Sequence, residues 1–169
     1  MPLLTILIPT RNRARDLKRC LELIADAVET AACAQDVEVV CADNCSQDDT
    51  RAVVTAAASR MPYLRYERQL EERASAEASY FNSIDFCRGE FVWRFGDDDE
   101  MDATALVHLM PVLGKADFYL INMRILSEGK HHHYILTSAA NIQYRATSDL
   151  FKDLGVVSAT TTLSCLCVR

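Results

Sequence analysis

Apolar and polar residues follow two patterns along the chain, one typical of buried strands and one typical of amphipathic helices. Short unbroken apolar runs predict strands, whereas apolar residues three or four apart with charges between them predict helices. The predicted strands cover residues 3–8, 37–42, 63–67, 90–95 and 117–126. The predicted helices cover residues 13–28, 48–59, 74–87 and 102–113. Strand and helix therefore alternate through most of the chain.

This alternation predicts an α/β domain built in layers around a mostly parallel sheet. Toward the end of the chain we expect a polar turn at residues 127–133, which include three histidines, then a short helix at 149–154 and a Thr-rich strand that ends at Arg169. No linker or internal repeat divides the sequence, so we expect one domain over residues 1–169.

Polar residues next to two predicted helices indicate where those helices begin and end. Ser46, with Asp49 three positions later, is typical of a helix N-cap. Arg88 and Gly89 follow helix 74–87 and are typical of a helix C-terminus.

Three polar clusters each follow a predicted strand of the parallel sheet. They are residues 10–12 (Thr-Arg-Asn), 43–44 (Asp-Asn) and 97–99 (Asp-Asp-Asp). Ligands of such sheets bind beyond the carboxyl ends of the strands, where the connecting loops gather. The sequence therefore predicts a binding site at the edge where these three clusters meet.

The acidic clusters have two interpretations each. Residues 97–99 form either a solvated turn that caps the helix beginning near Asp102 or a divalent-cation site built from carboxylates. Asp43 either ends its strand and caps a turn, or is a fixed acceptor for a base N–H or a ribose hydroxyl.

Four arginines lie in or near these clusters, and each taken alone is interpreted as a surface cation: Arg11, Arg13, Arg68 and Arg73. No GxGxxG or GxxxxGK[ST] loop is present, so neither a dinucleotide-binding nor a Walker-type phosphate loop is predicted.

Composition and charge limit the partners. The chain is 50% hydrophobic and 25% charged, which is typical of a folded globular domain, and its net charge is −6. Nucleic acid is not an expected partner, because its binding relies on Lys and Arg that neutralise phosphates. A single nucleotide remains compatible with this charge.

Neither a membrane span nor a signal peptide is expected. No stretch approaches the roughly 18–20 apolar residues that cross a bilayer, and the apolar start of the chain runs directly into Arg11. The seven cysteines lie mostly in hydrophobic segments, which is typical of reduced thiols. We therefore expect a cytoplasmic protein, or one at the cytoplasmic face of a membrane with which further parts associate peripherally.

Three segments carry a resemblance to a known family. Residues 4–13 (LTILIPTRNR), 39–50 (VVCADNCSQDDT) and 87–99 (CRGEFVWRFGDDD) resemble, in order and spacing, the nucleotide-sugar-binding half of family 2 glycosyltransferases of the GT-A fold. The last segment looks most like the abequosyltransferase branch of that family. The resemblance covers the first 100 residues or so and implies a GT-A, Rossmann-like, three-layer domain.

The resemblance implies which residues bind the donor. Pro9, Thr10 and Asn12 are expected to line the nucleotide pocket, and Asp43 to accept a hydrogen bond from a uracil-type base. Arg73 is expected to contact the base or a phosphate.

It also implies a metal site of the DxD type, for Mg²⁺ or Mn²⁺. Asp97 is expected to face the ribose, and Asp98 and Asp99 to hold the metal. Gly96 stands where many members of the family have their first aspartate.

The implied activity is metal-dependent, inverting transfer of a sugar from a nucleoside diphosphate, with a pyrimidine base favoured, to a saccharide or lipid-linked acceptor in bacterial surface polysaccharide synthesis. Residues 101–169 are expected to begin an acceptor-side half that looks truncated, so that the domain is incomplete at its C-terminal end. No general base is recognisable, since none of the three late carboxylates lies in a known motif: Glu128, Asp149 and Asp153. The alternative function is nucleotide-sugar binding without turnover.

Overall fold

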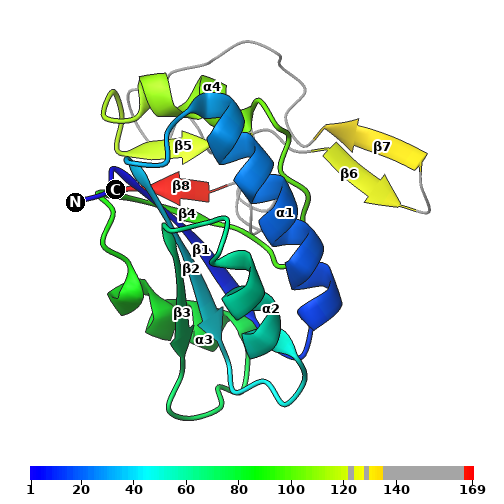
Figure 1. The fold of residues 1–169 in the computed structure, drawn as a ribbon. Helices are drawn as coiled ribbons and strands as arrows, with labels where there is room; N and C mark the ends of the chain where they lie inside the picture. The colour runs from blue at the N-terminus through cyan, green and yellow to red at the C-terminus, as the bar shows by residue number, and fades with distance from the viewer. Residues whose placement is uncertain (122–123, 128–129, 135–165) are drawn as a thin grey trace.

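Six strands form one central sheet in the order β3-β2-β1-β4-β8-β5 (Figure 1). The computed structural model describes residues 1–121, 124–127, 130–134 and 166–169. The strands are β1 (Leu4–Thr10), β2 (Val37–Asp43), β3 (Leu64–Arg68), β4 (Phe91–Arg94), β5 (Phe118–Leu120) and β8 (Leu166–Val168). Strands β1 to β4 pair in parallel, and β8 pairs antiparallel with both β4 and β5. The expected mostly parallel sheet is confirmed.

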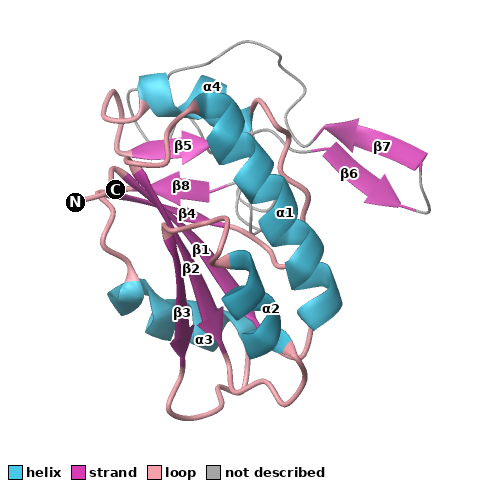
Figure 2. Cartoon of the chain, in the orientation of Figure 1, coloured by secondary structure: helices cyan, strands magenta, loops and turns pink. Residues whose placement is uncertain are grey.

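Helices cover both faces of this sheet (Figures 1 and 2). They are α1 (Ala14–Ala31), α2 (Thr50–Ala57), α3 (Ala76–Ser83) and α4 (Ala105–Leu109), with single 3₁₀ turns at Ile84–Phe86 and Met110–Val112. Buried residues of α1, α2 and α4 share one apolar core, whereas Tyr80 of α3 and Phe86 pack against a second cluster. The domain has the expected three layers.

Side-chain alternation along β1 shows why the sheet is covered twice. Leu4, Ile6 and Ile8 are fully buried in the core beneath α1. Leu7 points to the opposite face and packs with Val40 of β2 in the cluster beneath α3. Successive strand residues face opposite sides of the sheet. A strand that is apolar on both faces therefore needs a helix layer on each side.

Gly89 has a different role from the expected one. Helix α3 ends at Ser83, so Gly89 lies beyond it and does not cap it. A Cβ at Gly89 would lie 2.5 Å from the backbone nitrogen of Thr5 in β1. Glycine is therefore required here by the close approach of the chain to β1.

The segment after α4 also departs from the prediction. The strand expected over residues 117–126 is divided into β5 and a separate strand, β6 (Arg124–Ser127). β6 pairs antiparallel with β7 (Lys130–Tyr134) in a two-stranded sheet, so the polar turn expected at 127–133 is wrong for its histidines. The helix predicted at 149–154 lies outside the described residues. Among the described residues, no helix combines the length and the apolar character needed to cross a bilayer.

Candidate functional site

The carboxyl ends of β1 and β2 and the loop after β4 meet at one edge of the sheet. Thr10 at the end of β1 pairs in register with Asp43 at the end of β2. The Thr10 hydroxyl donates a hydrogen bond of 2.7 Å to Oδ2 of Asp97 in the loop after β4. The three polar clusters therefore lie together, as expected from the sequence.

Arg13 joins two of the aspartates after β4. Its Nη1 atom donates to Asp97 Oδ1 over 3.2 Å and to Asp98 Oδ2 over 2.7 Å. The Asp97 side chain is only 9% exposed, whereas the side chains of Asp98 and Arg13 are 57% and 49% exposed. Asp97 is therefore held within the protein, whereas Asp98 and Arg13 are in contact with solvent.

Burial dominates the electrostatics of Asp97. Its desolvation raises the pKa of the carboxyl above the ordinary value, and the hydrogen bond from Thr10 and the charge of Arg13 act in the opposite direction. A cation close to Asp97 thus stabilises a carboxylate that burial alone disfavours.

Gly96 leaves space that the following carboxylates occupy. A Cβ at this position would lie 2.5 Å from Asp99 Oδ2 and 3.3 Å from Asp98 Oδ1. Both carboxylates therefore turn back over the backbone of Gly96. A side chain at position 96 would therefore have to share this space with the carboxylate ends of Asp98 and Asp99.

Asp43 is completely buried, and both of its carboxylate oxygens accept hydrogen bonds. Oδ1 accepts from the backbone N–H of Ser46 over 2.8 Å. Oδ2 accepts from the Tyr66 hydroxyl and, over 2.9 Å, from Arg68. Arg68 is 45% exposed in its side chain, so it covers the solvent side of this carboxylate.

The loops after β1 and β2 are joined through Asn12. Its backbone N–H donates to Ser46 Oγ over 2.9 Å, and its side-chain Oδ1 accepts from Gln47 N over 2.8 Å. Asn12 and Cys45 have positive φ angles of 51° and 59°, a conformation that Asn tolerates better than most residues. Ser46 is thus a partner of Asn12, and the N-cap predicted for it is wrong, because α2 begins only at Thr50.

Asn44 fixes the backbone of Arg73 at the same edge. Its side-chain oxygen accepts from Arg73 N over 2.7 Å, and its amide nitrogen donates to Arg73 O over 3.1 Å. Within the described part of the chain, the buried Nε of Arg73 has no hydrogen-bond partner. Arg73 therefore carries an unpartnered buried donor on the residue whose backbone Asn44 holds. Pro9, half-buried near the end of β1, pairs in register with Ala42.

Sequence reasoning missed two arginines and a tyrosine of this site. Arg13 and Arg68 are not isolated surface cations, since each pairs with an aspartate of the predicted clusters. Pairing β2 with β3 in parallel sets Arg68 opposite Asp43, a register that inspection of the two strands could have suggested. The hydroxyl of Tyr66 has no comparable signal in the sequence.

The aspartates after β4 provide oxygen ligands of the kind that a divalent cation shares with a phosphate-bearing ligand. Among the described residues, no three or more His, Cys, Asp or Glu side chains gather as a metal cluster. Two carboxylates nevertheless converge on one cationic nitrogen of Arg13. Mg²⁺ is commonly held by one or two carboxylates together with substrate phosphates. The donor set therefore suits Mg²⁺ or Mn²⁺ with a phosphate-bearing ligand.

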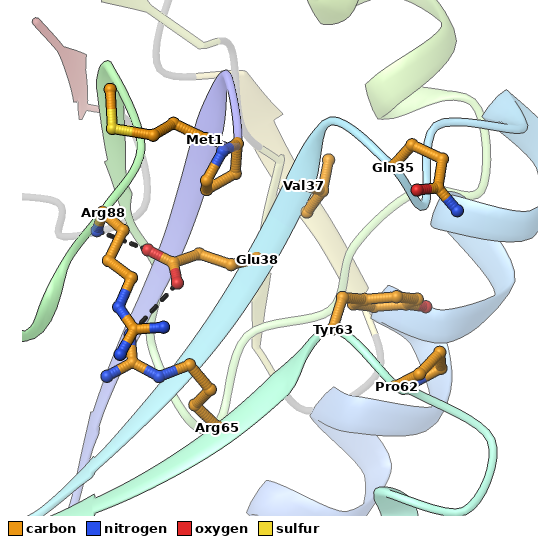
Figure 3. Close-up of a pocket in the computed structure, with 9 residues that line it drawn as sticks. Met1, Gln35, Val37, Glu38, Pro62, Tyr63, Arg65 and Arg88 are labelled. Carbon is orange, nitrogen blue, oxygen red and sulfur yellow. Dashed lines mark hydrogen bonds and ion pairs between the residues drawn. The ribbon is translucent and has the colours of Figure 1, made fainter.

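A hollow of about 300 Å³ lies at the opposite, amino-terminal edge of the sheet (Figure 3). It is lined by Val37 at the start of β2, by Glu38, and by Arg65 and Arg88. The Glu38 carboxylate accepts from Arg65 over 3.1 Å and from the backbone N–H of Arg88. Because this hollow is remote from the strand ends that carry Asp43 and Asp97, we do not regard it as the functional site.

The layered fold, with its polar site at the carboxyl edge of the parallel strands, defines a domain of the GT-A glycosyltransferase class. The chain belongs to the family described as Glycosyl transferase family 2, whose sequence profile matches residues 5–163. The resemblance inferred from the three motifs is confirmed.

Individual relatives are bacterial glycosyltransferases. The chain is 30% identical over 110 residues to GalNAc(5)-diNAcBac-PP-undecaprenol beta-1,3-glucosyltransferase of Campylobacter jejuni, covering 65% of this chain and 34% of the relative. It is 25% identical over 123 residues to the abequosyltransferase RfbV of Salmonella typhimurium, covering 72% and 36%. The chain thus spans about a third of the length of these relatives.

Solved structures confirm the fold. TarS 1-349 of S. aureus has a TM-score of 0.74 at 18% identity, covering 100% of this chain and 47% of that one. The mannosyltransferase PcManGT of Pyrobaculum calidifontis, in complex with GDP-Man and Mn²⁺, has a TM-score of 0.58 at 24% identity, covering 70% and 34%.

Proposed function

We propose that this chain binds a nucleoside diphosphate sugar with Mg²⁺ or Mn²⁺ and transfers the sugar to an acceptor hydroxyl with inversion. The observation that carries the proposal is the convergence of Asp97 and Asp98 on one cation position, tied to β1 through Thr10. Solved neighbours described as complexes with UDP-GlcNAc and with GDP-Man and Mn²⁺ support a nucleotide-sugar donor and a divalent cation.

The base of the donor is proposed to lie over Asp43. A carboxylate has about four lone-pair sites, and the three hydrogen bonds to Asp43 leave capacity for one further donor. Arg68, which covers the carboxylate, turns aside to admit a base N–H. Uracil and thymine present such an N–H at N3, and a uracil-type pyrimidine is the proposed base. Pro9, Thr10 and Asn12 line the pocket at the neighbouring strand end.

The diphosphate is proposed to lie between Arg73 and the aspartates after β4. The free Nε of Arg73 supplies a donor for a phosphate or for the base. Asp97 and Asp98 are proposed to hold the cation at the position where they now meet Arg13. Asp97 is also proposed to face the ribose, and Asp99 to be a further ligand. A divalent cation at this position would neutralise charge on the departing diphosphate.

In the proposed reaction, the acceptor oxygen forms a bond to the anomeric carbon while the bond from that carbon to the diphosphate oxygen breaks. The hydroxyl proton passes to a carboxylate base, and the nucleoside diphosphate leaves. The late carboxylates Glu128, Asp149 and Asp153 lie outside the described residues. In this proposal, the described residues serve donor binding and leaving-group stabilisation.

The relatives also suggest the acceptor and the setting. One is named for action on an undecaprenol-linked saccharide and another as an abequosyltransferase. We propose a saccharide or lipid-linked acceptor in bacterial surface polysaccharide synthesis, at the cytoplasmic face of the membrane.

Calorimetric titration of the chain with UDP, GDP and ADP in the presence of Mn²⁺ tests donor binding. We expect UDP to bind most tightly, and Asp43→Asn to remove the preference. Glu38→Gln is the matched control, because Glu38 is a buried carboxylate of the same strand at the other edge. Tightest binding of ADP would contradict the proposed base.

Transfer is tested with radiolabelled UDP-sugars and with saccharide or lipid-linked acceptors. Multiple-turnover transfer that depends on Mn²⁺ supports the full reaction and places the base within this chain. Nucleotide binding without transfer favours the alternative of a nucleotide-sugar-binding domain.

A further inference from the structure

A nitrogen of Arg13 occupies the point at which the carboxylates of Asp97 and Asp98 converge. Nη1 lies 3.2 Å from Asp97 Oδ1 and 2.7 Å from Asp98 Oδ2. Among the described residues, both ion pairs of Arg13 are with these two aspartates. The position is therefore already filled by a positive charge that belongs to the chain.

Arg13 can leave this position more easily than Asp97 can. Its side chain is 49% exposed, and it lies just before the first residue of α1. Asp97 is fixed from behind by Thr10 and is nearly buried. A cation that enters from solvent would therefore move Arg13 more easily than Asp97.

We propose that Arg13 is an exchangeable counter-ion, which holds the divalent-cation position closed until donor and metal bind together. This inference rests on the proposed function, because it assigns to that site a cation and a diphosphate. A metal that binds alone must break both ion pairs of Arg13. When a nucleoside diphosphate is also present, the released guanidinium gains phosphate oxygens as new partners, which it can contact in a bidentate manner.

The consequence is cooperative binding. Arg13 is expected to oppose the metal alone more strongly than the metal together with nucleotide. Bound nucleotide then raises the affinity of the site for the metal. By linkage, bound metal raises the affinity for nucleotide by the same factor. Removing the guanidinium should strengthen binding of the metal alone and reduce this coupling.

Arg19, in α1, provides a matched control. It pairs with Glu100 over 2.6 Å, just beyond the aspartates, and its side chain is 69% exposed. Arg19→Gln removes the same charge near the site without touching either carboxylate that Arg13 bridges. Arg13→Lys is the second variant, since it keeps the charge and loses the planar guanidinium.

The test is a titration with Mn²⁺ alone, in which the electron paramagnetic resonance signal reports the concentration of free Mn²⁺. The titration is then repeated at saturating UDP. Without UDP, we expect Arg13→Gln to bind Mn²⁺ about tenfold more tightly than the wild type, within the usual range of coupling between sites. We expect Arg19→Gln to match the wild type and Arg13→Lys to lie between the two. With UDP, the difference between Arg13→Gln and the wild type should shrink. Thermal unfolding of each variant confirms that it is folded.

Three outcomes would overturn the inference. If Arg13→Gln binds Mn²⁺ no more tightly than the wild type, Arg13 does not hold the position, and wild-type binding of Mn²⁺ with UDP would leave the proposed function intact. If Arg19→Gln gains as much affinity as Arg13→Gln, the effect is one of general charge. If the wild type binds neither Mn²⁺ nor UDP, the inference and the proposed function both fail.

Discussion

Strand β2 carries a buried carboxylate at each end, and the two form a natural comparison. Glu38 at the amino end is 6% exposed and Asp43 at the carboxyl end is 0% exposed. Each accepts three hydrogen bonds, one of them from an arginine of β3, which is Arg65 for Glu38 and Arg68 for Asp43. Burial and full hydrogen bonding therefore do not distinguish a ligand-binding carboxylate from a structural one.

The remaining partners do distinguish the two ends. Glu38 accepts from the Thr5 hydroxyl and from the backbone of Arg88, so it joins β1 to the segment that enters β4. Asp43 accepts from the backbone of Ser46 in a loop and from Tyr66. Glu38 thus stabilises the framework of the sheet, whereas Asp43 holds a loop beside the site.

The largest expected effect is a loss of stability that both ends share. Asp43→Ala and Glu38→Ala each remove three hydrogen bonds, at about 1 kcal/mol each, so we expect the free energy of unfolding to fall by about 3 kcal/mol in both. Urea denaturation measures it. A large fall in the free energy of unfolding for only one of the two variants would show that the carboxylates do not contribute equally to stability.

Substitution of the two glycines should affect different quantities, namely stability for Gly89 and UDP binding for Gly96. Gly89→Ala would place a Cβ against the backbone of Thr5, which cannot move aside, and should cost about 2 kcal/mol. Gly96→Ala would meet the movable end of Asp99. We expect it to cost less than about 1 kcal/mol while weakening Mn²⁺-dependent binding of UDP. Equal losses of stability with unchanged UDP binding would contradict this difference.

Nucleotide affinity should separate the two carboxylates. Asp43→Asn should weaken UDP binding about tenfold, which corresponds to about 1.4 kcal/mol, because a neutral amide is a weaker acceptor for the base N–H. Glu38→Gln should leave UDP binding unchanged. Calorimetric titration of both variants measures it, and a similar loss in Glu38→Gln would show an indirect effect of stability.

The smallest expected effect is a pH dependence found only at the Asp43 end. Burial, and then the hydrogen bond to Asp43, raise the pKa of Tyr66 above its ordinary value of 10.0. The fold therefore favours the protonated phenol, and this stability is present below pH 10 and lost as the pH rises through the higher folded-state value.

Tyr66→Phe removes this contribution, which at pH 8 is about 1 kcal/mol for one hydrogen bond. The difference in free energy of unfolding between wild type and Tyr66→Phe should narrow as the pH is raised from 9 to 11. A constant difference over that range would contradict the coupling. Glu38 has the hydroxyl of Thr5 in the corresponding place, so Thr5→Ala should show no such trend.

The central strands and helices were predictable because the apolar pattern that leads to their burial lies within each segment of the sequence. The runs that became β1 and β2 are buried along most of their length, and β4 buries Phe91 and Trp93. The apolar stripe of α1 recurs at helical spacing. The end of α3 and the role of Gly89 were not predictable in this way, since they depend on the approach of β1 from a distant part of the chain. The division of the strand expected at residues 117–126 likewise reflects pairing of β5 with β8.

The site was predictable in its location but not in its contacts. The rule that loops gather at the carboxyl edge placed Thr10, Asp43 and Asp97 together. It gave no account of Arg13 or Arg68, because an ion pair between distant residues depends on register and side-chain conformation. The parallel register of β2 and β3 could have suggested the pairing of Arg68 with Asp43, whereas no sequence pattern indicates that of Arg13.

The carboxyl edge is proposed to bind a nucleoside diphosphate through a divalent cation at residues 97–99. The most direct test of this proposal is the free energy of unfolding of wild type and Asp98→Asn with UDP, in Mn²⁺ or in EDTA. At about 100 times the dissociation constant, UDP should add roughly 2.7 kcal/mol to the wild type in Mn²⁺ and clearly less in EDTA. Asp98→Asn should keep only the smaller gain, with little change in the absence of ligand. Equal stabilisation of the wild type by UDP in Mn²⁺ and in EDTA would contradict the account.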